Sequence, residues 1–349
     1  MKITFIGDIF PANEALFVGF GIKSQFEKHK GACWADAVCS VTKSSDAVIG
    51  NLESPLLLKQ SACKDDFYGN YEMASFLKKC GINYLNIANN HILEHGVNGY
   101  NQTIDALNKE KIGIIGNKNE VIFIHSDNST IAIAGFSSVG KNISNTFSVL
   151  NKKNIKDALQ QMTEANADLK IFCFHWGDEY IHKPSVEQRK LAKSLIDMGA
   201  DIIIGHHPHV IQPYEQYKKG HIFYSLGNFC FDNPFQSRQF SKGMGVTISY
   251  NSETKGIEQV DTFGVRLSLK KLVYKMPCSK FESYFDKIQK NYQEIKDAKD
   301  YDLKYKKELA KRHVIERILM KVSLLRLFIH INNEEKWILL KNIKRYYLK

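Results

Sequence analysis

Three histidines lie within four consecutive positions, in the segment Gly205-His206-His207-Pro208-His209. They follow the apolar run 201–204, which is typical of a buried strand. Neutral imidazole is a common ligand for zinc-like and iron-like ions, and three imidazoles cluster at little cost when a cation lies between them. The alternative is a solvated loop rich in histidine, but only 12 of the 349 residues are histidine. We therefore interpret the segment as a metal-binding motif at the carboxyl end of a strand.

Four other apolar runs in the first 180 residues also end in side chains that can bind metals. The runs begin at residues 2, 47, 85 and 170, and the polar residues that follow them are, in order, Asp8, Asn51 with Glu53, Asn90 with His91, and His175. Helical patterns at 73–80, 98–109 and 186–198 alternate with these strands, which predicts an α/β protein with a largely parallel or mixed sheet. Ligands bind at the carboxyl ends of such strands, so we expect the five strand ends to meet on one rim.

The ordered motifs of the chain resemble those of the CapA family, bacterial proteins linked to poly-γ-glutamate and capsule synthesis. The motifs are IGD (6–8), NLESP (51–55), ANNH (88–91), HWGDEY (175–180), GHHPHV (205–210) and YSLGNF (224–229). The family in turn resembles the calcineurin-like metallophosphoesterase superfamily. The resemblance covers residues 1 to about 250 and implies a β-sandwich flanked by helices, in four layers ordered α-β-β-α, with a metal site on one edge.

The resemblance implies a role for each matching residue. The positions that match metal ligands of the superfamily are Asp8, Asn90, His175, His207 and His209. His206 competes with the last two for one place in the closing His-x-His pair. His91 matches a histidine that lies near the leaving group rather than on a metal.

Two positions depart from the superfamily pattern. Phe10 stands where a histidine usually follows the first aspartate, and Asn51 stands where a bridging aspartate usually follows glycine. We expect Glu53 to take the bridging task, with Asn51 as a weak ligand in the alternative interpretation. One or two divalent ions (Mn, Zn or Fe) are therefore expected, and the first of the two positions is expected to be weak, exchangeable or absent.

A centre of this kind predicts a metal-dependent hydrolase, because a bound metal lowers the pKa of water toward ~7. Asp8 and Glu53 are expected to supply the negative charge, and His91 to protonate the leaving oxygen or nitrogen. The bond is a phosphoester or a γ-glutamyl amide, within capsule, poly-γ-glutamate or exopolysaccharide synthesis or processing. The expected partners are an anionic polymer or phosphoester substrate and the capsule synthesis machinery.

Two other functions fit parts of the sequence. Phe10 and Asn51 favour a non-catalytic accessory or polymer-binding subunit of a capsule synthesis complex. The absence of a leader before the first strand favours a phosphodiesterase or phosphatase for a small metabolite. Three residues near the motifs stay open: Asp178 and Glu179 either orient the ligands or lie in a solvated loop, and Asn228 is expected to shape a turn beside the site.

Composition and cysteine spacing indicate an intracellular location. The chain has 44% hydrophobic and 24% charged residues, as globular proteins do. Its seven cysteines form no C-x-x-C pair, which predicts free thiols in a reducing compartment. With no leader before the first strand, we expect a cytoplasmic protein, or one peripheral at the inner face of the membrane.

The C-terminal part is basic and predicted to be mainly helical. Residues 301–349 hold 13 Lys and Arg against 5 Asp and Glu, whereas the whole chain carries a net charge of +11. We divide the chain into a catalytic domain, 1–250, and a linker with a helical extension, 251–349. Residues 250–262 predict a closing strand pair or linker, and 281–307 a long polar helix.

An amphipathic helix is expected at 310–331. Its apolar residues recur at helical spacing: Ile315, Ile318, Leu319, Val322, Leu325 and Ile329. Such a helix either docks this stripe on the catalytic domain or lies on an anionic membrane surface, and docking is our prediction. Nucleic-acid binding is not expected, because no recognised module accompanies the charge.

Overall fold

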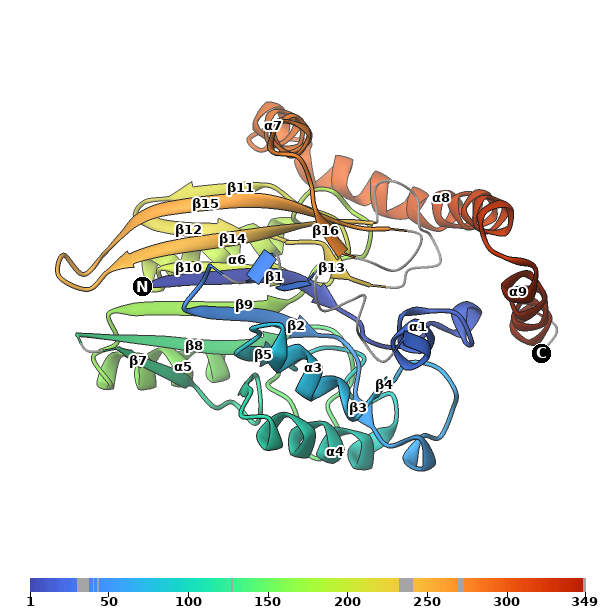
Figure 1. The fold of residues 1–349 in the computed structure, drawn as a ribbon. Coiled ribbons are helices and arrows are strands. Elements are labelled where there is room, and N and C mark those ends of the chain that lie inside the picture. Colours follow the sequence, from blue (N-terminus) through green and yellow to red (C-terminus); the bar gives the residue numbers. More distant parts are fainter. Residues whose placement is uncertain are drawn as a thin grey trace.

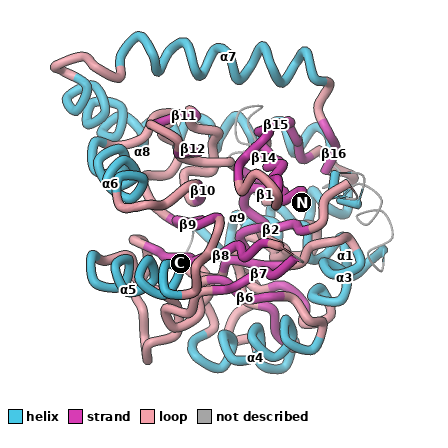
Figure 2. Tube along the Cα trace, turned by 90° about the vertical axis from the view of Figure 1, so that its left-hand side faces the viewer, coloured by secondary structure: helices cyan, strands magenta, loops and turns pink. Residues whose placement is uncertain are grey.

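The computed structural model describes residues 1–29, 38–39, 41–42, 44–126, 128–231, 241–268 and 273–347. For residues 313, 315–317, 319, 320, 323, 346 and 347 it describes the backbone alone. Two β-sheets lie face to face, and helices cover their outer faces (Figures 1 and 2). The protein is thus an α/β sandwich, as the resemblance predicted.

The first sheet holds the N-terminal strand near its centre. Its strand order is β16 (Val273–Lys275), β15 (Gly256–Leu267), β14 (Lys242–Asn251), β1 (Lys2–Ile9), β2 (Ala47–Leu52), β5 (Tyr84–Asn86) and β6 (Gly113–Ile115), with β13 (Asn228–Cys230) also paired to β1. Strands β1, β2, β5 and β6 run parallel, whereas β14, β15 and β16 extend the sheet antiparallel. The parallel strands therefore bring their carboxyl ends to the same edge.

The second sheet is built in the same way. Its strand order is β11 (Tyr214–Tyr217), β12 (Gly220–Phe223), β10 (Ile202–His206), β9 (Leu169–His175), β8 (Ser129–Ser137) and β7 (Ile122–Ser126). The four central strands are parallel and the two outer ones antiparallel. A short pair, β3 (Leu56–Leu57) and β4 (Gly69–Asn70), lies outside both sheets.

Three apolar layers hold the sandwich together. Between the sheets, Phe5 and Ile49 of the first sheet pack with Ile171 and Ile204 of the second. On the outer face of the first sheet lie α3 (Met73–Lys79) and α4 (Gly96–Lys109), and on that of the second lie α5 (Lys152–Glu164) and α6 (Val186–Asp197) (Figure 2). The strands read as continuous apolar runs because both of their faces are buried. The predicted four-layer order is confirmed.

The predicted elements agree with the structure except in the C-terminal part. The strands and helices expected in the first 206 residues are found within two residues of their predicted bounds. The closing strand pair expected at 250–262 is present but longer, because β14 begins at Lys242 and β15 ends at Leu267. The boundary predicted at residue 250 falls in this hairpin and stays a prediction. Short helices α1 (Ile22–His29), η1 (Ala15–Phe17) and η2 (Lys59–Ser61) occupy the connections.

The single helix predicted for 281–307 is wrong. The chain forms α7 (Cys278–Ile295) and α8 (Tyr301–His330), separated at residues 296–300. Arg189 of α6 explains the break: its guanidinium donates to the carbonyl of Lys296 at 2.6 Å and lies 5.6 Å from the ring of Tyr292 and 4.9 Å from that of Tyr301. Both rings can reach Arg189 only if the chain turns between them.

The predicted docking of the apolar stripe of 310–331 is also wrong. Ile318, Val322, Leu325 and Ile329 are more than half exposed, and the side chains of residues 315 and 319 lie outside the described ones. Helix α8 instead packs through other residues, such as Leu327, which is 5% exposed. The last helix, α9 (Asn333–Tyr347), packs on η1. Among the described residues, no helix is long and apolar enough to cross a membrane.

Candidate metal centre

Strand register brings the polar residues at the strand ends together. In the first sheet, Asp8 of β1 lies opposite Asn51 of β2 and Asn228 of β13. In the second sheet, His206 of β10 lies opposite His175 of β9. The predicted rim is therefore present, and both sheets contribute to it.

Gly7 allows the close approach that this arrangement needs. A Cβ atom at Gly7 would lie 2.0 Å from the carbonyl oxygen of Gly227, so only glycine fits there. The amide of Asp8 donates to that same oxygen at 2.9 Å. This hydrogen bond holds the segment before β13 against the end of β1.

Asp8 is the most heavily hydrogen-bonded acid of the centre. Its Oδ1 lies 3.0 Å from Nδ1 of His206 and accepts from Nδ2 of Asn51 at 2.9 Å, and its Oδ2 lies 3.5 Å from Nδ1 of His209. Complete burial would raise the pKa of Asp8, but the hydrogen bonds from His206 and His209 outweigh it and hold the pKa well below its usual range. Asp8 is therefore a permanent negative charge beneath the imidazoles.

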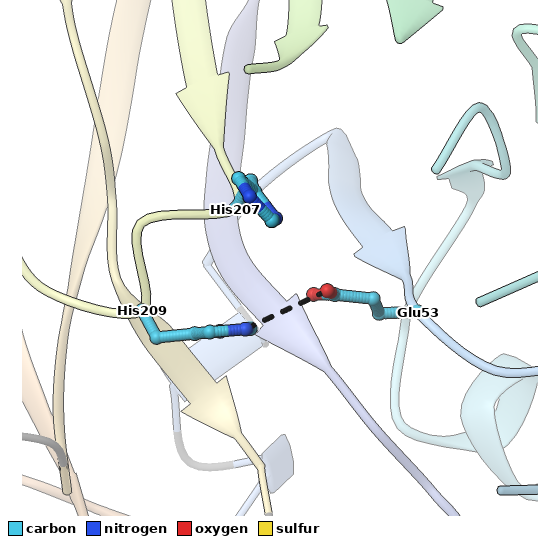
Figure 3. Close-up of side chains that lie close together, drawn as sticks. All are labelled: Glu53, His207 and His209. Atoms are coloured by element: carbon cyan, nitrogen blue, oxygen red, sulfur yellow. Dashed lines mark ion pairs between the residues drawn. The ribbon is translucent and has the colours of Figure 1, made fainter. Parts of the chain in front are cut away.

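Glu53 is equally buried but poorly paired. Its Oε1 lies 3.5 Å from Nε2 of His175 and 3.7 Å from Nε2 of His209, and no described atom hydrogen-bonds to it. Nδ1 of His207 is likewise buried without a hydrogen-bond partner among the described residues. Figure 3 shows Glu53, His207 and His209 converging on one point. Unpaired buried polar atoms cost free energy, so they indicate a missing ligand.

The donor atoms form two adjoining groups that fit a divalent cation. Glu53, His207 and His209 make one group, and Asp8, Glu53 and His175 make the other, with donor atoms within 4.8 Å of one another in each. Glu53 belongs to both groups, which agrees with the bridging task expected of it. A mixture of carboxylate and imidazole donors suits manganese, zinc or iron. The residues therefore fit the expected metal.

The remaining predicted ligands lie around these groups. Oδ1 of Asn90 is 2.7 Å from Nε2 of His175, next to the second group. His206 belongs to neither group, because its Nδ1 faces Asp8. The geometry therefore favours His207 and His209 over His206 for the closing pair, and the ligand assignment itself stays a prediction.

The two closing histidines adopt backbone conformations that few residues accept. His207 has a φ of 95° and His209 a φ of 56°, both in the left-handed region. Such a conformation costs about 1–3 kcal/mol per residue in a side chain larger than glycine. This strained turn after β10 places the imidazoles of His207 and His209 beside Glu53. The backbone strain is therefore located in the segment that orients these two donors.

Two asparagines contact the donor residues through their side-chain amides. Oδ1 of Asn228 accepts from Nδ1 of His209 at 3.0 Å, which leaves Nε2 of that ring toward Glu53. Oδ1 of Asn51 accepts from Nδ2 of Asn86 at 2.9 Å, while its own Nδ2 faces Asp8. The oxygen of Asn51 is therefore engaged, and the geometry favours Glu53 as the bridging residue. Asn86 was not singled out in the sequence.

Burial and charge divide the histidines of the centre into two kinds. In the protein alone, burial lowers the pKa of His175 well below its usual range and that of His207 to about 4, so both are neutral, as ligands must be. Burial also acts to lower the pKa of His209, but the charges of Glu53 and Asp8 outweigh it and raise that pKa to about 10. Burial likewise raises the pKa of Glu53. We expect this pair to retain a proton near neutral pH.

His91 lies beside the donor groups and has its own acceptor. Its Nδ1 is 2.9 Å from Oε1 of Glu94, and its ring stacks on Phe67 at 5.1 Å. Burial would raise the pKa of Glu94, but hydrogen bonds to His91 and Lys64 lower it to about 2. Glu94 therefore stays ionised and orients the imidazole. The His-x-x-Glu spacing is the sequence signal for this pair, because residues three apart on a turn lie side by side.

Apolar rings surround Phe10, the position at which the resemblance led us to expect a histidine. Phe10 is completely buried, stacked on Phe231 at 4.5 Å and edge-on to Phe67 at 5.5 Å. The ring of Phe231 in turn lies 4.4 Å from that of His209. This side of the centre therefore offers an aromatic wall and no metal donor among these three residues.

The loop after β9 closes the centre from the other side. Asp178 accepts from the hydroxyl of Tyr305 at 2.5 Å. Burial would raise the pKa of Glu179, but the nearby charge of His209 outweighs it and lowers that pKa. Tyr180 donates its amide to the carbonyl of Pro208 at 2.7 Å, and its ring is 5.8 Å from that of His209. These contacts argue against a freely solvated loop.

Known proteins are similar to this chain over about two thirds of its length. The profile of the family described as bacterial capsule synthesis protein PGA_cap matches residues 2–233. The capsule biosynthesis protein CapA of Bacillus anthracis is 34% identical over 253 residues, which are 66% of this chain and 60% of the relative. The PGA biosynthesis protein CapA of Bacillus subtilis is 34% identical over 249 residues, 66% of this chain and 63% of the relative. The chain thus spans less than two thirds of the length of these two relatives.

A solved structure supports the fold independently. A phosphatase from Mycoplasma pneumoniae superposes with a TM-score of 0.50 at 17% identity, over 82% of this chain and 98% of that one. The family match includes every residue of the donor groups and the His91–Glu94 pair. The chain therefore belongs to the bacterial capsule synthesis family, PGA_cap, of which CapA is a member.

Proposed function

We propose that this chain is a metal-dependent hydrolase acting in the synthesis or processing of capsule, poly-γ-glutamate or a related extracellular polymer. Family membership supports the biological setting, because the two Bacillus relatives are capsule and PGA biosynthesis proteins. The observation that carries the chemical part is the buried Oε1 of Glu53, which lies among three imidazoles and accepts no hydrogen bond from a described residue.

The charges of the centre suit one or two divalent cations. When bound, such an ion lowers the pKa of water toward about 7 and polarises the bond to be cleaved. Asp8 and Glu53 offset the positive charge, and His175, His207 and His209 complete the donor set. The strained turn after β10 holds the last two in place.

His91 is suited to act as the general acid. Its Nδ1 faces the ionised Glu94, so Nε2 is the nitrogen that can deliver a proton to a leaving oxygen or nitrogen. Phe67 stacks on the ring of His91, and Phe10 makes an edge-on contact with it at 6.2 Å. The cleaved bond is a phosphoester or a γ-glutamyl amide, and both release a group that needs this proton.

Elemental analysis of the tag-free protein tests this proposal. We expect one or two equivalents of manganese, zinc or iron, lost in Asp8→Ala and in His207→Ala but kept in His125→Ala, which removes an exposed histidine of β7. The metal-loaded protein is then assayed on phosphodiesters and γ-glutamyl peptides. Absence of metal after reconstitution with all three ions would contradict the proposal.

A non-catalytic accessory subunit is the second candidate. It is favoured by Phe10, which replaces an imidazole with a buried ring, and by Asn51, whose oxygen is taken by Asn86. On this reading the centre binds a metal or polymer for structural reasons. Polymer yield that is unchanged in a His91→Ala strain, with the metal retained, would favour the accessory role.

A further inference from the structure

A stripe of large apolar side chains on α8 faces away from the rest of the protein. Its members, between 57% and 66% exposed, are Val314, Ile318, Val322, Leu325 and Ile329. Their spacing of four, four, three and four residues puts them on one face of the helix, over a length of about 22 Å. We call this surface the α8 stripe. Soluble proteins rarely expose so continuous an apolar surface without a partner.

Basic residues continue the same face toward the start of α8. Lys311 and Lys307 precede Val314 at steps of three and four residues, and both are exposed, whereas Lys304, three residues earlier, pairs with Asp300 at 3.0 Å. The nearby acid Glu308 pairs with Lys183 at 2.6 Å and so turns toward the body of the protein. The outer face of α8 is thus basic in its first turns and apolar in its last turns.

The opposite face of α8 is already packed, so the stripe is not an undocked inner surface. Leu327, 5% exposed, joins a cluster with Phe17, Phe20 and Leu339, which ties α8 to η1 and α9. Nearer its start, the hydroxyl of Tyr305 donates to Asp178 in the loop after β9. Figure 1 shows α8 running along the edge of the molecule toward α9. Rotating the helix to bury the stripe would expose these contacts.

We propose that the α8 stripe, together with Lys307 and Lys311, binds the surface of an anionic lipid bilayer. Apolar side chains of an interfacial helix enter the boundary between headgroups and acyl chains, while lysines contact anionic headgroups. On α9, Trp337 is 76% exposed and Leu340 is 53% exposed, and tryptophan favours that boundary. No described helix can cross the membrane, so the helix would lie in its plane.

A second copy of the chain fits this surface less well. Helices that pair through an apolar stripe usually carry opposite charges along its flanks. Here the described flanking residues Lys321 and Arg326 have the same sign, so two copies would bring like charges together. An anionic bilayer complements both the stripe and its flanks.

Binding would hold the metal centre close to the bilayer. The inner side of α8 contacts the loop that follows His175: Tyr305 reaches Asp178, and Arg312 donates to the carbonyl of Glu179 at 3.5 Å. That loop also carries Tyr180, which packs beside His209. One helix therefore separates the proposed lipid-binding face from the centre.

Co-sedimentation of the full chain with lipid vesicles tests this inference. We expect binding to vesicles of phosphatidylcholine with phosphatidylglycerol, and much weaker binding to phosphatidylcholine alone. The double variant Ile318→Ser/Leu325→Ser should weaken binding by about tenfold or more, and Lys307→Gln/Lys311→Gln by about fivefold for each lysine. Ile143→Ser, at an isoleucine that is 54% exposed in a loop, is the matched control and should bind like the unmodified protein.

The same samples also test whether a second copy of the chain, instead of a lipid bilayer, binds the α8 stripe. All four substituted positions are exposed, so circular dichroism and metal content should be unchanged. Equal binding of all variants, or no binding to anionic vesicles, would overturn the inference. So would a dimer, detected by light scattering, that dissociates in Ile318→Ser/Leu325→Ser while no variant binds lipid.

Discussion

His91 and Glu94 show how one hydrogen bond assigns a role to a side chain. The contact between Nδ1 of His91 and Oε1 of Glu94 orients the imidazole, and the pKa of Glu94, lowered to about 2, keeps the carboxylate ionised. Neither residue belongs to the donor groups around Glu53. Their contribution should therefore separate experimentally from metal binding.

Replacing Glu94 by glutamine should lower kcat about tenfold or more while leaving metal content unchanged, because a neutral amide makes a weaker hydrogen bond to Nδ1 of His91 than a carboxylate does. Steady-state kinetics on the substrate found in the screen, together with elemental analysis, would measure this. Glu164→Gln changes an exposed carboxylate at the end of α5 and should have no effect. Loss of metal in Glu94→Gln would instead place Glu94 in the ligand shell.

Metal affinity should rise with pH across the neutral range. Burial raises the pKa of Glu53, and the nearby carboxylates raise that of His209 to about 10, so in the protein alone this pair holds a proton that the metal must displace. Because a group with a raised pKa loses its proton only as the pH increases, the metal affinity increases with pH. Calorimetry in buffers of different ionisation enthalpy should detect proton release, and a pH-independent affinity would show that the pair is already deprotonated.

Individual strands contribute to the metal centre because donor residues lie at or just beyond their carboxyl ends. In strand β1, Gly7 lets the backbone of Gly227 approach, and the segment that follows Gly227 places Asn228 beside His209. Strand β10 ends in the strained turn of the closing histidines. The elements therefore fix donor positions through backbone contacts, before any side chain meets a metal.

Gly7→Ala should destabilise the protein by about 1–3 kcal/mol and weaken metal binding, since the new methyl group must displace the backbone of Gly227. Thermal unfolding and elemental analysis would record both effects. Gly256→Ala, where the nearest atom to the new Cβ lies 3.7 Å away, is the control and should change little. Normal stability in Gly7→Ala would mean that β1 and the Gly227 segment can separate freely.

At the scale of the whole molecule, the sandwich and the C-terminal helices have different tasks. The sandwich brings the ends of strands from two sheets to one centre, and α7, α8 and α9 follow it along the chain. Helix α8 joins these parts, because its inner side contacts the loop after β9 and its outer face carries the α8 stripe. Among the described residues, the thiols of Cys39, Cys63, Cys173 and Cys278 form no disulfide, and Cys33 lies outside those residues.

Local sequence pattern alone determined the strand ends and much of the centre. Asp8, His175 and the histidines after β10 each follow an apolar run, and a run buried on both faces specifies a strand whatever surrounds it. The order of the motifs also identified the family and with it the four layers. These features depend on residues close together in the chain.

Only the tertiary structure decided contacts between distant segments. In the folded protein, Nδ1 of His206 faces Asp8, and the side-chain oxygen of Asn51 accepts a hydrogen bond from Asn86. The sequence does not show these contacts, because the register between strands determines which side chains meet. The tertiary structure also exposed the stripe of α8: helical spacing shows that apolar residues share a face, whereas packing against the rest of the chain determines which face is buried.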